Sequence, residues 1–117
     1  MTMPEQASWK VEFYRDARGH SPAWEFLQQL PGVERAKLLA VIDLLQEFGV
    51  SLRFPHTRLI EKGLWELRAG PGRLFYVALV GRRLVILHGY RKKSQKAPRR
   101  EIEAALRRWA DLLEREK

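Results

Sequence analysis

Alternation of apolar and polar positions predicts four strands in this chain. In the first, residues 9–14, the side chains of Trp9, Val11 and Phe13 would face a core and the residues between them would not. Three more strands follow one another closely at 64–69, 73–79 and 84–90, separated by turns at 70–72 and 81–82. The last two are apolar on both faces, which favours central positions in a sheet. A short edge strand at 57–60 is also predicted.

A period of 3.6 residues predicts three helices. Ser21 and Pro22 are typical of an N-cap and first helical position, Pro31-Gly32 ends that helix, and further helices are expected over 33–48, ended by Gly49, and from near Pro98 to Arg115. The predicted buried stripes are Trp24, Phe26, Leu27 and Leu30; Leu38, Val41, Ile42, Leu45 and Phe48, widened by Leu39 and Leu44; and Ile102, Ala105, Leu106, Trp109, Leu112 and Leu113.

The order β-α-α-β-β-β-α indicates an α+β fold, with a small antiparallel sheet, an N-terminal helical hairpin on one face and a C-terminal helix. The 117 residues suffice for one domain, spanning 1–117. Cysteine is absent, which excludes a disulfide framework and fits a reducing compartment. The first ten residues lack a signal pattern and no apolar run is long enough to span a membrane, so we expect a soluble, cytoplasmic protein without a membrane partner.

Charge is distributed unevenly along the chain. The net charge is +8, but residues 1–52 hold five Lys/Arg against seven Asp/Glu, whereas residues 53–117 hold seventeen against seven. Residues 91–100 contain six basic side chains and no acidic one. Such a block directly after a sheet favours a polyanionic partner, most simply nucleic acid, over a merely solvated basic surface.

Few residues offer catalytic chemistry. The three histidines, His20, His56 and His88, lack metal-ligand spacing, and neither a phosphate-binding glycine loop nor a nucleophile elbow is present, so no metal or other cofactor is expected. Glu66 would most simply pair with a neighbouring arginine, and Trp65 and Trp109 are predicted core residues.

A cationic and aromatic group remains. Arg68 and Arg73 lie almost opposite each other across a turn, and His88 and Tyr90, two residues apart, share one strand face. Guanidinium groups can stabilise a phosphorane, tyrosine or histidine can transfer protons, and aromatic rings can stack on RNA bases. Arg68 as a solvent-facing strand residue, and His88 and Tyr90 as core or rim residues, remain open as purely structural interpretations.

Three segments resemble a known family. They are G-L-W-E-L-R at 63–68, R-L-F-Y at 73–76, and L-H-G-Y-R-K-K-S-Q-K-A-P-R-R-E-I-E-A-A at 87–105, of which the K-K-S-Q-K-x-P-R-R-E block is the specific part. The chain is similar to the HigB-like branch of the RelE/ParE toxin superfamily, also labelled phage-derived killer proteins. The resemblance implies a RelE/ParE-like toxin of a type II toxin–antitoxin pair, with a cognate antitoxin, commonly a helix-turn-helix DNA-binding protein.

The resemblance also implies an activity and its residues. We expect a metal-independent endoribonuclease that cleaves mRNA on the ribosome; a ParE-like inhibitor of DNA gyrase and an inactive nucleic-acid-binding module are the alternatives. The expected catalytic residues are Arg68, Arg73, Tyr90 and Lys93. The expected RNA- or ribosome-binding residues are His88, Arg91, Lys92, Lys96, Arg99 and Arg100.

Overall fold

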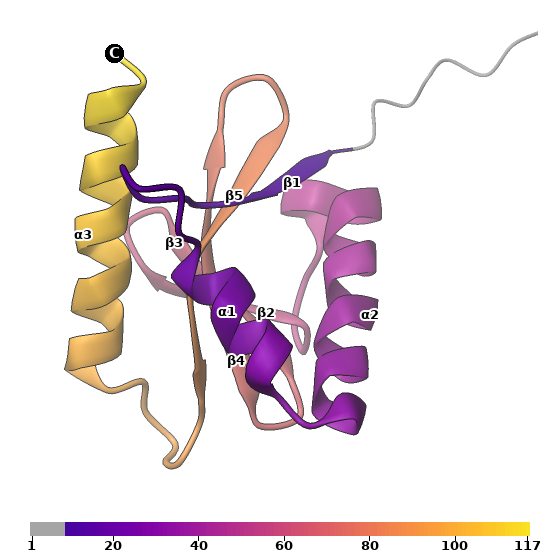
Figure 1. Cartoon of the computed structure of the whole chain (residues 1–117). Coiled ribbons are helices and arrows are strands. Elements are labelled where there is room, and N and C mark those ends of the chain that lie inside the picture. The colour runs from indigo at the N-terminus through magenta and orange to yellow at the C-terminus, as the bar shows by residue number, and fades with distance from the viewer. Residues whose placement is uncertain (1–8) are drawn as a thin grey trace, which may run out of the picture.

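The computed structural model describes residues 9–117 (Figure 1). The N-terminal residues considered for a signal pattern lie, up to residue 8, outside the described residues. In order, the elements are β1 (Lys10–Phe13), α1 (Pro22–Gln29), α2 (Gly32–Phe48), the 3-10 turn η1 (Gly49–Ser51), β2 (Thr57–Glu61), β3 (Leu64–Ala69), β4 (Gly72–Leu79), β5 (Arg83–Arg91) and α3 (Arg99–Arg115). Every predicted helix and strand is present, including the edge strand.

The strands form one sheet in the order β1-β5-β4-β3-β2. The two strands predicted to be central, β4 and β5, are central. β2 to β5 form an antiparallel meander, but β1 pairs in parallel with β5, placing Lys10 opposite Arg83, so the sheet is mixed rather than wholly antiparallel. Alternation locates a strand and its buried face, whereas its direction in the sheet depends on the path of the helices between β1 and β2.

Helices cover both faces of the sheet, so the α+β class and its layers are confirmed (Figure 1). The α1–α2 hairpin packs on one face and α3 on the other. The first core contains Ala23, Leu27, Leu30, Leu38, Val41, Ile42, Leu45, Leu52, Leu67, Leu74, Tyr76, Leu84 and Ile86, with Trp9, Val11, Phe13 and Trp65 packed against it. The second contains Tyr14, Leu64, Phe75, Val77, Val85, Leu87, Tyr90, Ile102, Ala105 and Leu112, with Leu106 and Trp109 packed against it.

Local signals explain where the hairpin begins and ends. The Ser21 hydroxyl accepts a hydrogen bond from the Trp24 amide at 3.4 Å, as the N-cap prediction requires. Gly49 ends α2 with a φ of +55°, and a Cβ there would lie 2.1 Å from the Trp9 indole. Gly89 on β5 allows α1 to approach, because a Cβ there would lie 2.4 Å from the Phe26 ring.

The predicted stripes are too wide at their margins. Trp24, Leu39, Phe48 and Leu113 are exposed rather than buried. Phe48 and Leu113 lie in the last turns of their helices at the margins of the stripes, whereas Leu45 and Leu112 in the same turns are buried. No helix in residues 9–117 combines the length and apolarity needed to cross a bilayer.

Candidate functional site

Strand register brings the predicted catalytic side chains into one row. Arg68 on β3 is the partner of Arg73 on β4, and Arg73 is the partner of Tyr90 on β5. A second row two residues away holds Glu66, Phe75 and His88 on the same three strands. Because alternate residues of a strand point to the same side, both rows lie on the sheet face that α3 covers.

A pocket of about 160 Å³ opens over these rows. Its walls are β2, the sheet, the loop between β5 and α3, and the first turn of α3. The lining residues are Arg58, Leu59, Ile60, Glu66, Arg68, Arg73, Tyr90, Lys92, Ser94, Gln95, Lys96, Ala97 and Ile102. The structure therefore brings together five of the predicted site residues: Arg68, Arg73, Tyr90, Lys92 and Lys96.

Glu66 lies at the base of this pocket and links its charged groups. One carboxylate oxygen is 3.8 Å from the Nε atoms of both Arg68 and Arg73. The other accepts a 2.9 Å hydrogen bond from the Tyr90 hydroxyl. Glu66, Arg73 and Tyr90 are 4%, 5% and 7% exposed. A buried acid between two guanidinium groups and a phenol is thus held by three partners at once.

Backbone carbonyls fix Arg73 further. Its Nη1 donates to the carbonyl oxygens of Gly70 at 2.6 Å and Gly72 at 2.9 Å, both at the β3–β4 turn. Burial lowers the pKa of Arg73, and the Glu66 carboxylate opposes that shift. A guanidinium starts so far above neutrality that Arg73 remains a cation. The site therefore presents a fixed positive charge.

The pKa of Tyr90 shifts in the opposite direction. Burial raises the pKa of its hydroxyl, and the negative charge of Glu66 raises it further. At neutral pH the phenol is therefore protonated, and it can donate a hydrogen bond or a proton but is a poor base. A protonated phenol and the carboxylate that accepts its hydrogen bond therefore lie in direct contact beside two arginines.

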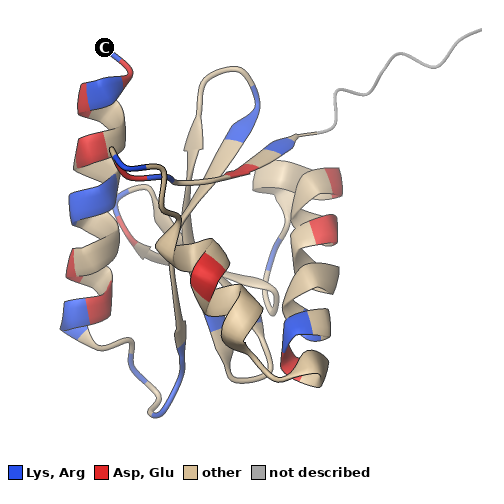
Figure 2. Cartoon of the chain, in the orientation of Figure 1, with Lys and Arg blue, Asp and Glu red and all other residues tan. Residues whose placement is uncertain are grey.

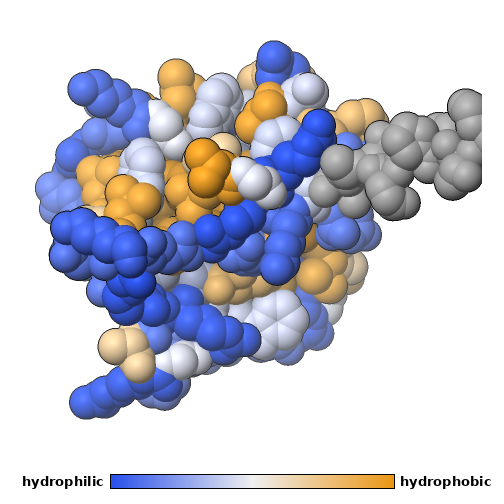
Figure 3. Space-filling model, turned by 90° about the horizontal axis from the view of Figure 1, so that it is seen from above, coloured by the Kyte–Doolittle hydropathy of each residue, from blue (hydrophilic) through white to orange (hydrophobic). Residues whose placement is uncertain are grey.

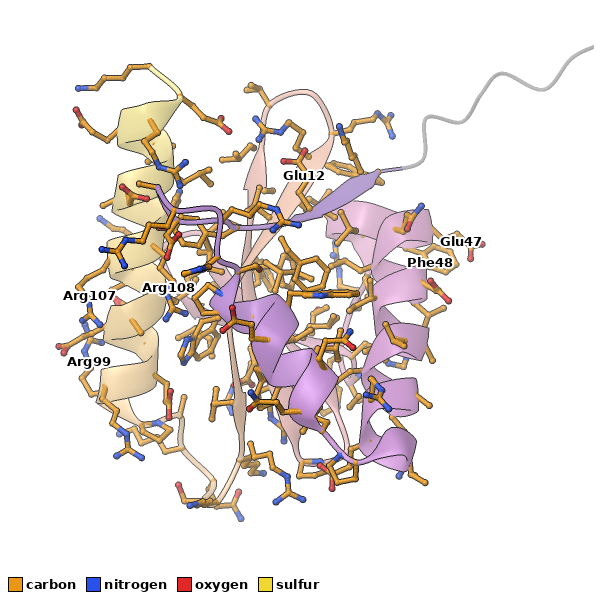
Figure 4. The ribbon with its side chains drawn as sticks, in the orientation of Figure 1. Glu12, Glu47, Phe48, Arg99, Arg107 and Arg108 are labelled. Atoms are coloured by element: carbon orange, nitrogen blue, oxygen red, sulfur yellow. The ribbon has the colours of Figure 1, made fainter. Side chains whose placement is uncertain are left out.

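His88 is adjacent to the pocket but does not line it. An irregularity in the β4–β5 register turns both Leu87 and His88 toward α3, where the imidazole is 2.6 Å from a Glu101 carboxylate oxygen. On its other side, Nδ1 is 2.6 Å from an Arg108 guanidinium nitrogen, and Arg108 points from α3 toward the sheet (Figure 4).

Arg108 determines the tautomer of that imidazole. A guanidinium can only donate, so Nδ1 accepts and Nε2 carries the hydrogen donated to Glu101. Burial is the main cause that lowers the pKa of His88, and Glu101 opposes it. We conclude that His88 is neutral at pH 7. The stacked rings of His88 and Tyr90, 6.3 Å apart, connect this cluster to the pocket.

Other predicted site residues lie outside the pocket. Arg91 pairs with Glu34 at 2.6 Å, because strand alternation turns it toward α2. Arg99 pairs with Glu61 at 2.7 Å, and the Nε of Arg100 is 3.7 Å from Glu101. Lys93 lines a shallow hollow with Gly70, Pro71, Arg73, Lys92, Ser94 and Gln95 on the other side of the loop.

The basic residues of 91–100 therefore do not form one surface. Lys92 and Lys96 line the pocket, Lys93 lines the hollow on the other side of the loop, and the arginines lie near acidic side chains. Figure 2 shows the loop between β5 and α3 with Lys and Arg and without acidic residues, whereas α3 carries both signs. Within residues 9–117, His, Cys, Asp and Glu form no group of three that could hold a metal ion.

The comparisons identify the family. The model of the Gp49-like phage-derived protein family matches residues 25–110, which is most of the chain and the whole pocket. The chain belongs to this family. The predicted membership of the RelE toxin superfamily, among its phage-derived members, is thereby confirmed.

This Gp49-like protein was also compared with solved structures and with curated proteins. Among solved structures, a chain of the RelBE2 toxin–antitoxin complex from Mycobacterium tuberculosis is 19% identical, covers 77% of this chain and 98% of its own, and superimposes with a TM-score of 0.47. The search of curated proteins gave no significant match.

Several residues that line the pocket of the Gp49-like protein were not predicted as site residues from the sequence. Glu66 was considered only as a partner for an arginine, although alternation already placed it beside Arg68 on one strand face. Arg58, the register partner of Glu66 on the edge strand, carried the same signal. Ser94 and Gln95 had no such signal, because only the fold of the loop brings them to the pocket.

Proposed function

We propose that this protein is the toxin of a type II toxin–antitoxin system and that it cleaves mRNA on the ribosome. The observation that carries the proposal is the row Arg68–Arg73–Tyr90 with Glu66 beneath it. Family membership supports the toxin assignment, and the cationic pocket supports an RNA substrate. A cognate antitoxin and a cytoplasmic location follow from the same proposal.

In the proposed reaction an RNA 2′-hydroxyl attacks the adjacent phosphorus, and the bond to the 5′-oxygen breaks. The products are a 2′,3′-cyclic phosphate and a 5′-hydroxyl. Negative charge accumulates on the non-bridging oxygens of the phosphorane, where Arg68 and Arg73 would donate hydrogen bonds. The backbone anchors of Arg73 hold its guanidinium in place before the substrate arrives, so little reorganisation is needed.

Two proton transfers accompany these steps. Glu66 is a carboxylate at the base of the pocket and would accept the proton of the 2′-hydroxyl. Tyr90, whose raised pKa keeps it protonated, would give its proton to the 5′-oxygen. The 2.9 Å hydrogen bond between them then returns the proton from Glu66 to the phenolate. Each residue ends in its initial state, and no metal ion is required.

The remaining cations would position the strand. Lys92 and Lys96 lie at the pocket without an acidic partner in the described part of the chain, which suits contacts with mRNA or rRNA phosphates. Lys93, Arg91, Arg99 and Arg100 do not line the pocket, so we propose that they contribute to ribosome docking, which for Lys93 takes the place of the catalytic role expected from the resemblance.

Primer extension on mRNA-programmed ribosomes tests the proposal, with naked mRNA alongside. We expect 5′ ends to appear only on the ribosome and to vanish when the attacking nucleotide is 2′-deoxy. Arg73→Ala should lower the cleavage rate roughly 100- to 1,000-fold. Because Arg73 is buried, Arg68→Gln provides a second test at a side chain that is 23% exposed.

Arg107→Ala is the matched control, since Arg107 points away from the sheet on α3 (Figure 4). It should cleave like the wild type. Full cleavage by a folded Arg68→Gln/Arg73→Ala variant would contradict the assigned roles. If the folded wild type cuts no RNA but blocks DNA supercoiling, the protein is instead a gyrase inhibitor.

A further inference from the structure

A large aromatic side chain is exposed next to the pocket. Phe54, in the loop between η1 and β2, is 75% exposed. Isolated exposed apolar residues are common on protein surfaces, and apolar patches also occur at the opposite end of the molecule, as Figure 3 shows. Exposure alone therefore does not mark a site, and the surroundings of Phe54 decide its meaning.

The loop that carries Phe54 is well anchored. The Thr57 hydroxyl donates to the Leu52 carbonyl at 2.9 Å in a buried position, and the His56 amide donates to the Arg53 carbonyl at 3.0 Å. The backbone amide of Arg68 donates to the His56 carbonyl at 2.8 Å, which ties the loop to β3. The ring is thus presented at a fixed place beside Arg68.

Phe54 shares a second hollow with the two site arginines. This hollow, of about 340 Å³, is lined by Phe54, Pro55, His56, Arg68, Gly70 and Arg73. The Arg68 guanidinium carbon lies 6.0 Å from the centre of the Phe54 ring. Arg68 and Arg73 therefore stand between two hollows, one with Glu66 and Tyr90 and the other with an aromatic ring.

We propose that Phe54 is a stacking platform for the nucleobase next to the phosphate that Arg68 and Arg73 hold. The inference rests on the proposed function and adds a subsite to it. A single RNA strand has the two features that this surface complements, an anionic backbone and flat apolar bases. A base on Phe54 would fix the strand while its phosphate lies between the arginines, and it would align the 2′-hydroxyl for attack.

Abasic substitution tests the stacking directly. Programmed ribosomes carry mRNAs with one abasic nucleotide at each position flanking the cut, and single-turnover cleavage is measured for wild type, Phe54→Ala, Phe54→Leu and Phe54→Tyr. Loss of base–aromatic stacking should lower kcat/KM by about 5- to 150-fold. We expect this loss for Phe54→Ala and Phe54→Leu on intact mRNA, and for the wild type at one abasic position. Phe54→Tyr, which keeps the ring, should resemble the wild type.

The double-mutant cycle separates stacking from other effects. Phe54→Ala should lose nothing further at the abasic position that slows the wild type. Phe48→Ala, which removes an exposed phenylalanine from the outer face of α2 (Figure 4), is the matched control and should cleave normally. Normal cleavage by Phe54→Ala, or an undiminished abasic effect in that variant, would overturn the stacking proposal alone. Absence of cleavage by the folded wild type would overturn the proposed function with it.

Discussion

The most informative perturbation is removal of the charge on Glu66, because this carboxylate neutralises two arginines in a largely buried position. Glu66→Gln keeps the size of the side chain and an oxygen that can accept the Tyr90 hydrogen bond. At 3.8 Å and an effective dielectric constant of about 20, each arginine contact is worth about 4 kcal/mol before desolvation.

Desolvation of Glu66 and the partial exposure of Arg68 reduce that sum. Breaking a buried ion pair from one side costs about 3–5 kcal/mol, since the remaining charge is left uncompensated. We therefore expect Glu66→Gln to lower the free energy of unfolding by about 3 kcal/mol, because Arg68 and Arg73 would then lie close together without a negative charge between them.

Urea unfolding followed by tryptophan fluorescence measures this loss. With a slope of about 1–3 kcal/mol per molar urea, the midpoint should fall by roughly 1–3 M. Glu103→Gln, which removes one partner of an exposed ion pair with Arg99, is the control and should leave the midpoint where it is.

A double-mutant cycle gives the decisive result. Arg73→Met removes the buried cation, so Glu66→Gln/Arg73→Met leaves no buried charge without a partner. Its destabilisation should be smaller than the sum of the single losses by about 2 kcal/mol. Additivity within about 0.5 kcal/mol would refute the conclusion that these two side chains neutralise each other.

Three further predictions concern neighbouring groups. Tyr90→Phe should lower the cleavage rate roughly 100- to 10,000-fold on programmed ribosomes, and a rate near wild type would exclude Tyr90 as the acid. Because the pKa of His88 is lower in the folded state, the unfolded chain binds more protons just below its ordinary pKa, about 6.5. The free energy of unfolding should therefore fall as the pH drops from about 6.5 to 5, and His88→Gln should flatten that slope in urea titrations; an unchanged slope would mean that another group titrates. Lys92→Ala/Lys96→Ala should reduce the slope of log affinity against log salt for programmed ribosomes by about 0.7 for each phosphate that the variant no longer neutralises, whereas equal slopes would place both lysines outside the interface.

Much of the site followed from local rules. The period of two placed Arg68 and Tyr90 on definite strand faces, and the glycine turn after β3 set Arg73 opposite Arg68. The same rule should have divided the basic block, because Arg91 is the last residue of β5 and faces away from Tyr90, toward Glu34. Residues 91–100 therefore cannot be taken as one basic surface, because the alternation along β5 turns Arg91 to the other side.

Other features depend on tertiary structure alone. The register shift that turns both Leu87 and His88 toward α3 lies beside a strand glycine, Gly89, but that glycine also allows the close approach of Phe26 and does not by itself locate the shift. Arg108 reaches His88 across twenty residues of sequence, and its contact fixes the imidazole tautomer. Neither the parallel pairing of β1 nor the hollow beside Phe54 is encoded in a short pattern, since both arise where distant segments meet.

The parallel pairing of β1 with β5 has a consequence for biosynthesis. A ribosome makes β1 first, but Lys10 has no strand partner until Arg83 has been added. The pocket is assembled later still, because its walls extend from Arg58 to Ile102 on α3. The nascent chain therefore carries an incomplete sheet and no pocket through most of its translation, and whatever the pocket does begins only when synthesis has passed the first turn of the last helix.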